Sequence, residues 1–305
     1  MAKKTSLFAE PHFQNDEAAR AMLESILWPD GPVCAHCGVV NHAYKTKRPG
    51  VFRCAEKVCR KDFSVTMKTV MERSHIALHK WLQAFHLMTS SKKGVSAHQL
   101  HRTLQIGYEA AWFMAHRIRE AMRLGGLSPM GGGGKVVEAD ETYFGFLEGQ
   151  LKKGRLGTSN RNTVVTLVER GGSARSFHVD GSRVADIAPI LRANLSRETR
   201  LMTDEYVSYK EVGREFASHE TVNHSKDEYV RGDITTNTVE GYYSIFKRGM
   251  KGVYQHCAEK HLHRYLSEFD FRYSNRIALG VDDGERRTLA VKGAAGKRLT
   301  YRGRH

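Results

Sequence analysis

The sequence lacks a hydrophobic run long enough to cross a membrane. A spanning helix needs about 20 consecutive apolar residues, and no stretch of the 305 residues approaches that length. The N-terminus also lacks the apolar core of a secretory signal. These two absences argue against a membrane protein and a secreted protein, and they predict a cytoplasmic one.

Cysteines are too few for a disulfide framework, since the chain has five. In a reducing cytosol such cysteines serve as metal ligands or remain free thiols. Acidic residues are also scarce: 33 Asp and Glu stand against 48 Lys and Arg, for a formal net charge of +15. This excess is typical of proteins that bind polyanions, DNA or RNA above all, although other soluble basic proteins share it.

Four of the five cysteines form two close pairs. Two residues separate the members of the first pair and four separate those of the second. Four thiolates at about 2.3 Å from a zinc ion close a tetrahedral structural site. The spacing therefore predicts a zinc ribbon over residues 31–66, with a bulged second knuckle and with His36 as an alternative ligand. The predicted zinc ligands are Cys34, Cys37, Cys54 and Cys59.

The segments on either side of the ribbon are predicted to be helical. A leader over residues 1–30 contains one amphipathic helix, and residues 67–130 contain three apolar stripes at helical spacing. A short helix, a turn at Gly107 and a following helix are typical of a helix-turn-helix, whose last helix enters the major groove of DNA. Arg117 and Arg119 on that helix are the predicted DNA contacts. A plain three-helix connector remains the alternative.

From residue 131 the pattern changes to alternating strands and helices. Three strands, a helix, a strand, a helix, a strand near 221–225 and a long helix follow one another over residues 131–280. This is the order of an RNase H-like α/β domain. The chain is therefore expected to be a multidomain α+β protein, and the Gly-rich, basic residues 281–305 are expected to form a loosely ordered tail.

Two acids lie where this fold brings strand ends together. Asp140 ends the apolar part of the run 135–144, and Asp204 ends the strand that begins near residue 200. Adjacent carboxylates repel unless a cation lies between them, and Mg²⁺ prefers a few carboxylates together with water. Solvated acids on an edge strand are the alternative. Alternation along the strand places Glu138 on the face of Asp140 and Glu141 on the opposite face, and neither is expected to be needed for catalysis.

A third acid lies on the long helix that follows. Glu240 and Lys247 are two turns apart on a polar stripe beside an apolar face. Such a helix can direct a carboxylate and a cation towards the acids of the sheet. An ordinary amphipathic helix with solvated charges is the alternative.

Together these motifs resemble the DDE transposases of bacterial insertion sequences, in the branch with an N-terminal zinc ribbon (ISXO-like). The similarity spans roughly residues 15–276. It rests on the cysteine pairs and on further runs at residues 138–143, 203–204, 222–225, 237–241 with 247–248, and 260–269 with 271–272.

The resemblance implies catalytic and binding roles for particular residues. Asp140, Asp204 and Glu240 become the catalytic triad that binds Mg²⁺ (or Mn²⁺), and Lys247 becomes their basic partner, with Arg248 beside it as a DNA contact. Asn237 is a rival third ligand, since some relatives use Asn. Zn²⁺ is structural in this reading.

The function that the resemblance implies is that of a DNA transposase. It cleaves the ends of an insertion sequence and transfers the 3′-hydroxyl strand into target DNA by two-metal phosphoryl transfer. The implied partners are double-stranded DNA and further copies of the chain on that DNA, in the nucleoid. Two rivals remain: a DNA-binding regulator with an inactive RNase H-like domain, and an RNase H-like nuclease without strand transfer.

Overall fold

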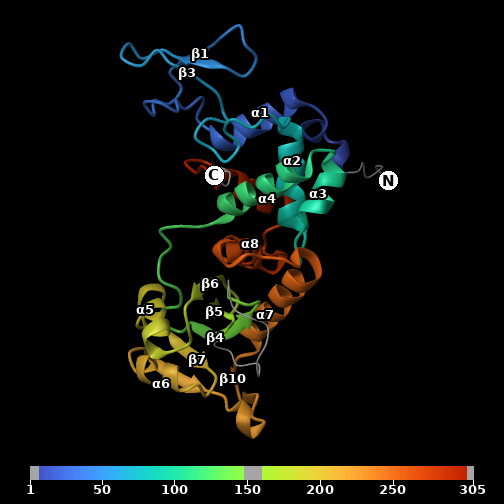
Figure 1. The fold of residues 1–305 in the computed structure, drawn as a ribbon. Helices are drawn as coiled ribbons and strands as arrows, with labels where there is room; N and C mark the ends of the chain where they lie inside the picture. Colours follow the sequence, from blue (N-terminus) through green and yellow to red (C-terminus); the bar gives the residue numbers. More distant parts are fainter. Residues whose placement is uncertain (1–6, 148–159, 301–305) are drawn as a thin grey trace, which may run out of the picture. The chain divides into compact units, whose positions relative to one another are not determined.

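The computed structural model describes residues 7–147 and 160–300, and its contacts divide the chain into two compact units (Figure 1). The first unit is formed by Met1–Arg123 together with Asp282–His305, and the second by Leu124–Val281. The first six residues of the predicted leader and the last five of the predicted tail lie outside the described residues. Within the described part, no helix combines the length and the apolar character that crossing a membrane requires.

The first unit begins with a helix and a small sheet. Three short strands form an antiparallel sheet in the order β1 (Ala43–Lys45), β2 (Phe52–Cys54) and β3 (Asp62–Phe63). In β2, Phe52 and Cys54 are buried while Arg53 between them is exposed, as alternation along a strand requires. Trp28 packs edge-on against Phe52 and Phe63, so one aromatic cluster holds this small sheet together.

The predicted helices of the first unit are present in the structure. They are α1 (Asp16–Leu27), α2 (Leu78–Ser90), α3 (Ala97–Leu104) and α4 (Tyr108–Met122). Their starts follow from local chemistry, because Asn15 accepts the N–H of Ala18 and Ser96 accepts that of Gln99. Trp81 and Phe85 of α2 are almost fully buried in the core of this unit.

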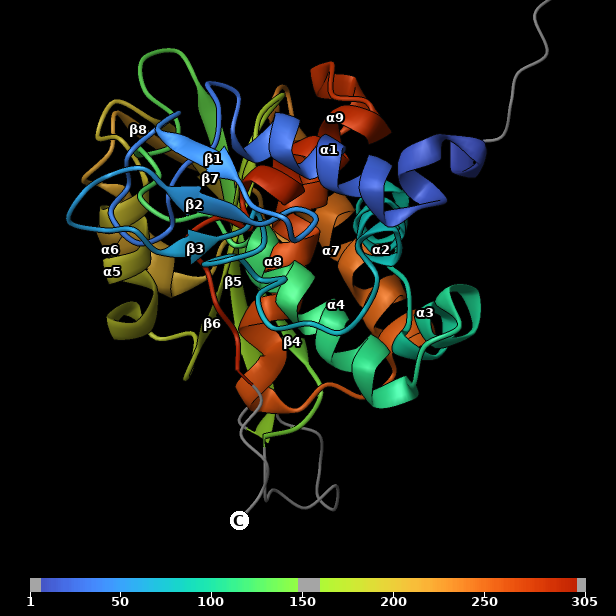
Figure 2. The ribbon, with the colours of Figure 1, turned by 90° about the horizontal axis from the view of Figure 1, so that it is seen from above.

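The expectation of a loosely ordered tail is wrong, because residues 283–292 form a helix, α9 (Asp283–Lys292). Figure 2 shows α9 beside α1, and it also packs on α2 and α4. Val291 and Ala294 are fully buried, and Lys297 donates to the carbonyl of Glu120 at 3.0 Å, at the end of α4. The basic composition did not predict this helix, because an arginine can be buried once its charge is paired, as that of Arg286 is with Asp283 in the preceding turn.

Removing the C-terminal segment should unfold the first unit. A chain truncated after Val281 loses the buried side chains of α9, whose removal should cost about 3 kcal/mol or more. We expect the truncated chain to lack the thermal unfolding transition of the first unit and to be cleaved by protease within residues 1–123. A chain truncated after Thr300 keeps these contacts and should behave like the full chain. Equal protease resistance of both truncated chains would contradict this.

The second unit is built on a five-stranded mixed sheet in the order β6-β5-β4-β7-β8. The antiparallel strands are β4 (Val136–Phe144), β5 (Asn162–Glu169) and β6 (Ala174–Val179), while β7 (Arg200–Thr203) and β8 (Ser218–Thr221) run parallel to β4. A separate hairpin is formed by β9 (Val230–Arg231) and β10 (Ile234–Thr235).

Helices cover both faces of this sheet (Figure 1). One face carries α5 (Val184–Asn194) and α6 (Val207–Gly213), and the other carries α7 (Asn237–Gly249) and α8 (Leu262–Ser274). Short helical turns complete the chain at Leu7–Ala9, Pro11–Phe13, His224–Lys226, Met250–Tyr254, Glu259–His261 and Ile277–Leu279.

The last strand of the sheet differs from its expected place. It was expected near 221–225, but β8 is Ser218–Thr221 and residues 224–226 form a helical turn. As an edge strand, β8 is partly exposed along its length and can be made of polar residues. His219 and Glu220 are held there by Thr203 and Arg200 of β7, which hydrophobic periodicity does not report.

Candidate active site and zinc centre

Asp140 and Asp204 are brought to one level of the sheet by the parallel pairing of β4 with β7. The last paired residues are Glu138 and Met202, and each acid lies two residues further along its strand direction. Neighbouring strands lie about 4.8 Å apart. Extending this register brings the two acids to the same level of the sheet. Asp204 directly follows the end of β7, as expected, whereas the expected place of Asp140 at the end of its strand is wrong, because β4 continues to Phe144.

Asp140 lies in a strongly acidic and buried environment. Burial raises the pKa of its carboxyl group well above the usual range, and the neighbouring charges of Glu141, Asp204 and Glu240 raise it further. The N–H of Glu141 donates to Oδ1 at 2.8 Å, which opposes the rise. Three other acids thus act on Asp140 at once. Such a group needs a proton or a cation to be stable.

Asp204 immediately follows β7 and lies beside a second acid, Glu205. Burial raises the pKa of Asp204, while the N–H of Tyr206, which donates to Oδ1 at 3.0 Å, works to lower it. Glu205 accepts the N–H groups of His224 and Ser225 at 2.9 and 3.1 Å. This contact holds the loop after β8 next to Asp204. Glu205 was missed by the sequence analysis, although it directly follows Asp204 in the chain.

Glu240 lies in the first turn of α7 and is partly exposed. The hydroxyl of Thr236 donates to its Oε1 at 2.8 Å, and Nε2 of His224 lies 3.7 Å from the same oxygen. Glu240 acts on the pKa of Asp140, so α7 brings it near the sheet acids. Asn237 is exposed at the start of the same helix and remains the alternative third ligand.

Lys247 lies further along α7 with its ammonium group over the ring of Tyr243, 5.9 Å from the ring centre. Burial lowers the pKa of Lys247, and the charge of Asp140 works in the opposite direction. Lys247 therefore supplies positive charge close to Asp140. Arg248 is exposed, and its guanidinium group donates to the hydroxyl of Ser244 at 2.6 Å.

Glu138 and Glu141, which were expected not to be needed for catalysis, are not solvated side chains. Glu138 is fully buried and is bound by Arg170 at 2.6 Å. Glu141 accepts the hydroxyl of Tyr209 at 2.9 Å, and burial raises its pKa to about 7. Their faces are as predicted, since Glu141 points to the α5–α6 side. Neither is a neutral control for Asp140, because Glu138 is bound to Arg170 and Glu141 to Tyr209.

The predicted DNA contacts on α4 are not on the surface. Arg119 is 2% exposed and Arg117 is 9% exposed. Arg117 donates to the carbonyl of Glu72 at 3.1 Å and lies over the ring of Phe113. The assignment of both residues as phosphate contacts is corrected accordingly. Helical spacing identified α4, but which of its faces is covered depends on contacts such as those with α9 and residues 297–299.

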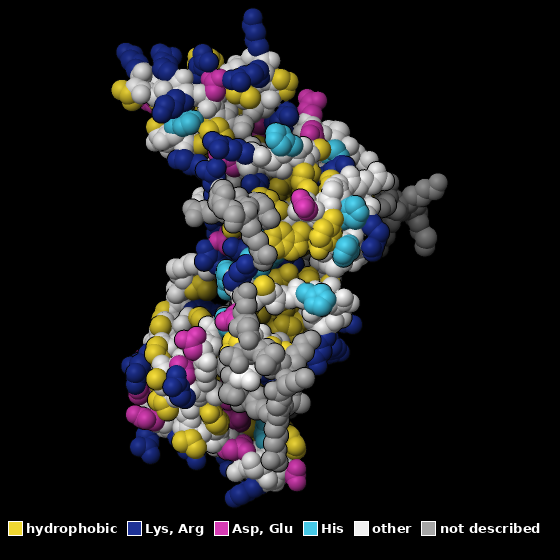
Figure 3. All heavy atoms as spheres, viewed as in Figure 1, with side chains coloured by type: hydrophobic (Ala, Val, Ile, Leu, Met, Phe, Trp, Pro, Cys, Tyr) yellow, Lys and Arg dark blue, Asp and Glu magenta, His cyan; other side chains and the backbone are white. Residues whose placement is uncertain are grey.

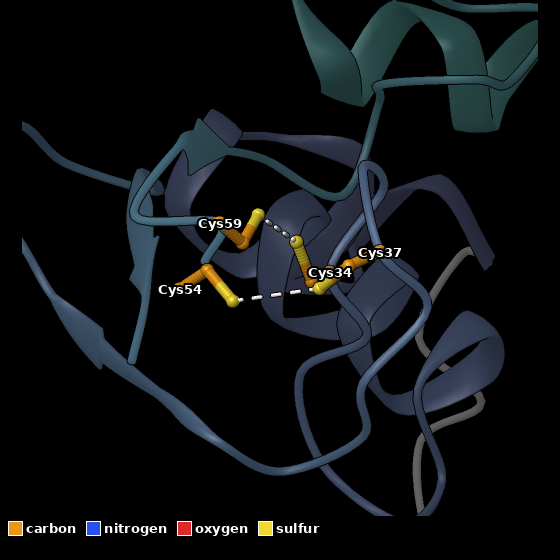
Figure 4. A group of neighbouring side chains, drawn as sticks. All are labelled: Cys34, Cys37, Cys54 and Cys59. Carbon is orange, nitrogen blue, oxygen red and sulfur yellow. Dashed lines mark hydrogen bonds between the residues drawn. The ribbon is translucent and has the colours of Figure 1, made fainter. Parts of the chain in front are cut away.

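The four predicted zinc ligands converge in the ribbon (Figure 4). Their sulfur atoms all lie within 4.8 Å of one another, with 3.8 Å between Cys34 and Cys59 and 3.6 Å between Cys37 and Cys54. Four sulfurs bound tetrahedrally at about 2.3 Å from a zinc ion lie about 3.8 Å apart. The cluster therefore has the dimensions of a zinc site. His36 is not part of it, because its Nε2 lies 3.0 Å from the carbonyl oxygen of Asp62.

Each knuckle of the zinc site is closed by a residue in the left-handed region. Gly38 follows the first pair with φ 80°, and Arg60 follows the second with φ 49°. The longer second spacing is accommodated by a turn in which the N–H of Cys59 donates to the carbonyl of Glu56 at 3.0 Å. Burial raises the pKa of Cys54, whereas, against the effect of burial, hydrogen bonds from backbone N–H groups lower the pKa of Cys34 to about 6. A zinc ion would supply the positive charge that holds four thiolates together.

Among residues 7–147 and 160–300, the cysteines are the only set of three or more potential ligands gathered this tightly. The three acids are more widely spread.

Two family models match the chain. Residues 131–274 match an ISXO2-like transposase domain, and residues 14–62 match a transposase zinc-ribbon domain. An uncharacterized protein in transposable element ISH50 of Halobacterium salinarum is 28% identical over 281 residues, which is 85% of this chain and 91% of that protein. Both matched families are transposase families, and the matches cover the zinc ribbon and the mixed α/β domain. These matches confirm the resemblance to zinc-ribbon transposases of the ISXO2-like kind that was drawn from the motifs.

The ribbon should contain one zinc ion per chain. Elemental analysis of the full chain should find this ion. Cys54→Ser should lose it and unfold the ribbon, because three thiolates no longer close the site. Cys257→Ser is the matched control, since Cys257 is the cysteine outside the cluster. A folded ribbon without zinc would rule the site out.

Proposed function

We propose that this protein is a DNA transposase that cleaves the ends of an insertion sequence and joins the 3′-hydroxyl strand to target DNA. The observation that supports the proposal is the parallel pairing of β4 with β7, which ends two residues before Asp140 and Asp204, together with the charge of Glu240 that acts on Asp140 from α7. Acids rather than a serine or tyrosine nucleophile suit a displacement at phosphorus without a covalent protein intermediate.

The domain that carries these acids is RNase H-like in our proposal. The support is the strand order, in which an antiparallel meander of β4, β5 and β6 is extended by two parallel strands on the other side of β4. The first strand is then central, and helices cover both faces of the sheet. Asp140 lies in the middle of this strand, paired with Thr166 of β5, so the sheet fixes its backbone.

Asp140, Asp204 and Glu240 are the residues that would hold divalent ions, Mg²⁺ or Mn²⁺. The donor set fits, since carboxylate oxygens are the ligands these ions prefer, and the pKa values of Asp140 and Asp204 are raised by burial and by neighbouring acids. When bound, such ions activate the attacking oxygen and neutralise the scissile phosphate. Lys247 adds a fixed positive charge beside Asp140 that can bind the phosphate.

The three acids should each be essential for strand cleavage. Asp140→Asn, Asp204→Asn and Glu240→Gln keep the shape of the side chain but remove one negative charge from the site. We expect each to lower the rate of Mg²⁺-dependent cleavage of labelled element ends by about 100-fold or more, with DNA binding unchanged.

Asp227→Asn is the control for these variants. Asp227 is exposed, and its backbone lies in the left-handed region that Asn also tolerates. Full activity of Glu240→Gln together with an inactive Asn237→Ala would make Asn237 the third ligand. Normal cleavage by both aspartate variants would refute the transposase assignment, and cleavage without joined products would favour a nuclease.

The zinc ribbon is the DNA-binding surface that we favour within residues 31–125. Lys and Arg side chains gather on the ribbon in Figure 3. Two of its arginines are paired with Asp62, whereas further basic side chains are exposed. The exposed basic residues of the strands and knuckles are Lys45, Lys47, Arg48, Arg53, Lys57, Arg60 and Lys61.

DNA binding should depend steeply on salt and should require the basic ribbon. Exchanging both Lys57 and Lys61 for Gln removes two potential phosphate contacts, each of which contributes about 0.9 to the slope of log affinity against log salt. We expect the slope measured by fluorescence anisotropy to fall by about 2. The same exchange at Lys210 and Arg214, which are exposed in and beside α6, should leave the slope unchanged. An equal loss in both variants would mean that general charge, and not the ribbon, determines binding.

A further inference from the structure

The first turn of α7 is capped by a side chain from the central strand and not from the helix itself. Glu138 of β4 accepts the N–H of Thr238 at 2.7 Å and the N–H of Val239 at 3.0 Å on Oε2. Its other oxygen accepts the hydroxyl of Thr238 at 2.8 Å. These two N–H groups have no partner within a helix and attract negative charge. A carboxylate from β4 therefore fixes the start of α7.

Arg170 makes the burial of this carboxylate possible. Glu138 is fully buried, and an unpaired charge there would be strongly destabilising. Arg170 donates to Oε1 of Glu138 at 2.6 Å through Nε, and its other nitrogens donate to the carbonyls of Asp233 and Thr235 at 2.8 and 2.9 Å. The same guanidinium group thus fastens the segment that leads into α7 to the central strand.

Thr236, the residue before α7, does not cap this helix and makes a different contact. Thr236 makes no capping hydrogen bond to the first turn, although threonine is a favoured capping residue. Its hydroxyl donates instead to Oε1 of Glu240 at 2.8 Å. Because Glu138 satisfies the first turn, Thr236 is available to orient the carboxylate of Glu240.

We propose that Glu138, held by Arg170, is a positioning residue that sets the place of Glu240 relative to Asp140. The path between the two acids is short and consists of ordered groups. Glu138 is two residues before Asp140 on the same face of β4, and Val239, whose N–H it binds, directly precedes Glu240. The inference rests on the proposed function, because it concerns Glu240 as a ligand of a divalent ion.

The test is the affinity of the zinc-loaded full chain for Mn²⁺, measured by electron paramagnetic resonance of the free ion. Glu138→Gln keeps the shape but loses the charge that binds Arg170 and the helix start. We expect this variant to bind Mn²⁺ about tenfold more weakly, in line with the loss of one charged hydrogen-bonded contact. In a Glu240→Gln background, Glu138→Gln should cause no further loss, since it acts through Glu240.

Glu268→Gln is the matched control for a merely structural effect. Glu268 is also fully buried and paired with an arginine, Arg272, but it lies on α8, away from the start of α7. We expect its melting temperature to fall as that of Glu138→Gln does, with Mn²⁺ affinity unchanged. If Glu138→Gln does not fold, Thr238→Val removes one of the hydrogen bonds more gently and should weaken Mn²⁺ binding by about threefold.

The outcomes separate this inference from the proposed function. Equal Mn²⁺ affinities of the Glu138→Gln and Glu268→Gln variants would overturn the positioning role. So would a tenfold loss that persists in full in the Glu240→Gln background. If Glu240→Gln itself left Mn²⁺ binding unchanged, the ligand assignment in the proposed function would be wrong, and the inference would fail with it.

Discussion

The parallel pairing of β4 with β7 is the constraint on which the candidate active site depends. A shift of the register by one residue would move Asp204 away from the level of Asp140 and would turn the side chains of the strand to the opposite face. The register is held by the apolar residues on the α5–α6 side, where Val137 and Leu201 are fully buried. Burial of these apolar side chains thus offsets the unfavourable free energy of placing two carboxylates close together. Their raised pKa values reflect the cost that remains.

Two buried acids of the second unit connect a helix to another element of the fold. Glu138 joins β4 to α7 and is compensated by Arg170. Asp270 of α8 accepts hydrogen bonds from Ser176 of β6 and from Tyr242 of α7, and burial raises its pKa to about 6. These groups add directional contacts to a helix that packing alone would leave free to slide. A metal site needs such precision, because small displacements of a ligand weaken binding and slow the chemistry.

The first unit is closed by the two ends of the chain. Its last helix, α9, returns after the whole second unit has been completed, and its buried side chains contact helices from the first 123 residues. A chain truncated within its C-terminal segment would therefore lose an element of its N-terminal unit. The ribbon is different in this respect, because its small core of Trp28, Phe52 and Phe63 is supplemented by the zinc site that the four cysteines form.

The sequence by itself determined the features whose physical signal is local. Cysteine spacing identified the ribbon, helical periodicity identified α1 to α4 and α7, and the order of strands and helices anticipated the mixed sheet. Asp140 and Asp204 could be selected because apolar runs that carry acids are uncommon, and Glu240 was selected from the polar stripe of its helix and from the family resemblance, but the catalytic roles of all three stay a prediction. Only the tertiary structure decided which face of α4 is covered, that residues 283–292 form a helix, and that Glu138 is buried. Each of these depends on a partner distant in the chain: Arg117 on residues 297–299, α9 on α2, and Glu138 on the start of α7 about 100 residues later. Periodicity and composition describe a segment alone, whereas burial of a charge is decided by the group that pairs with it.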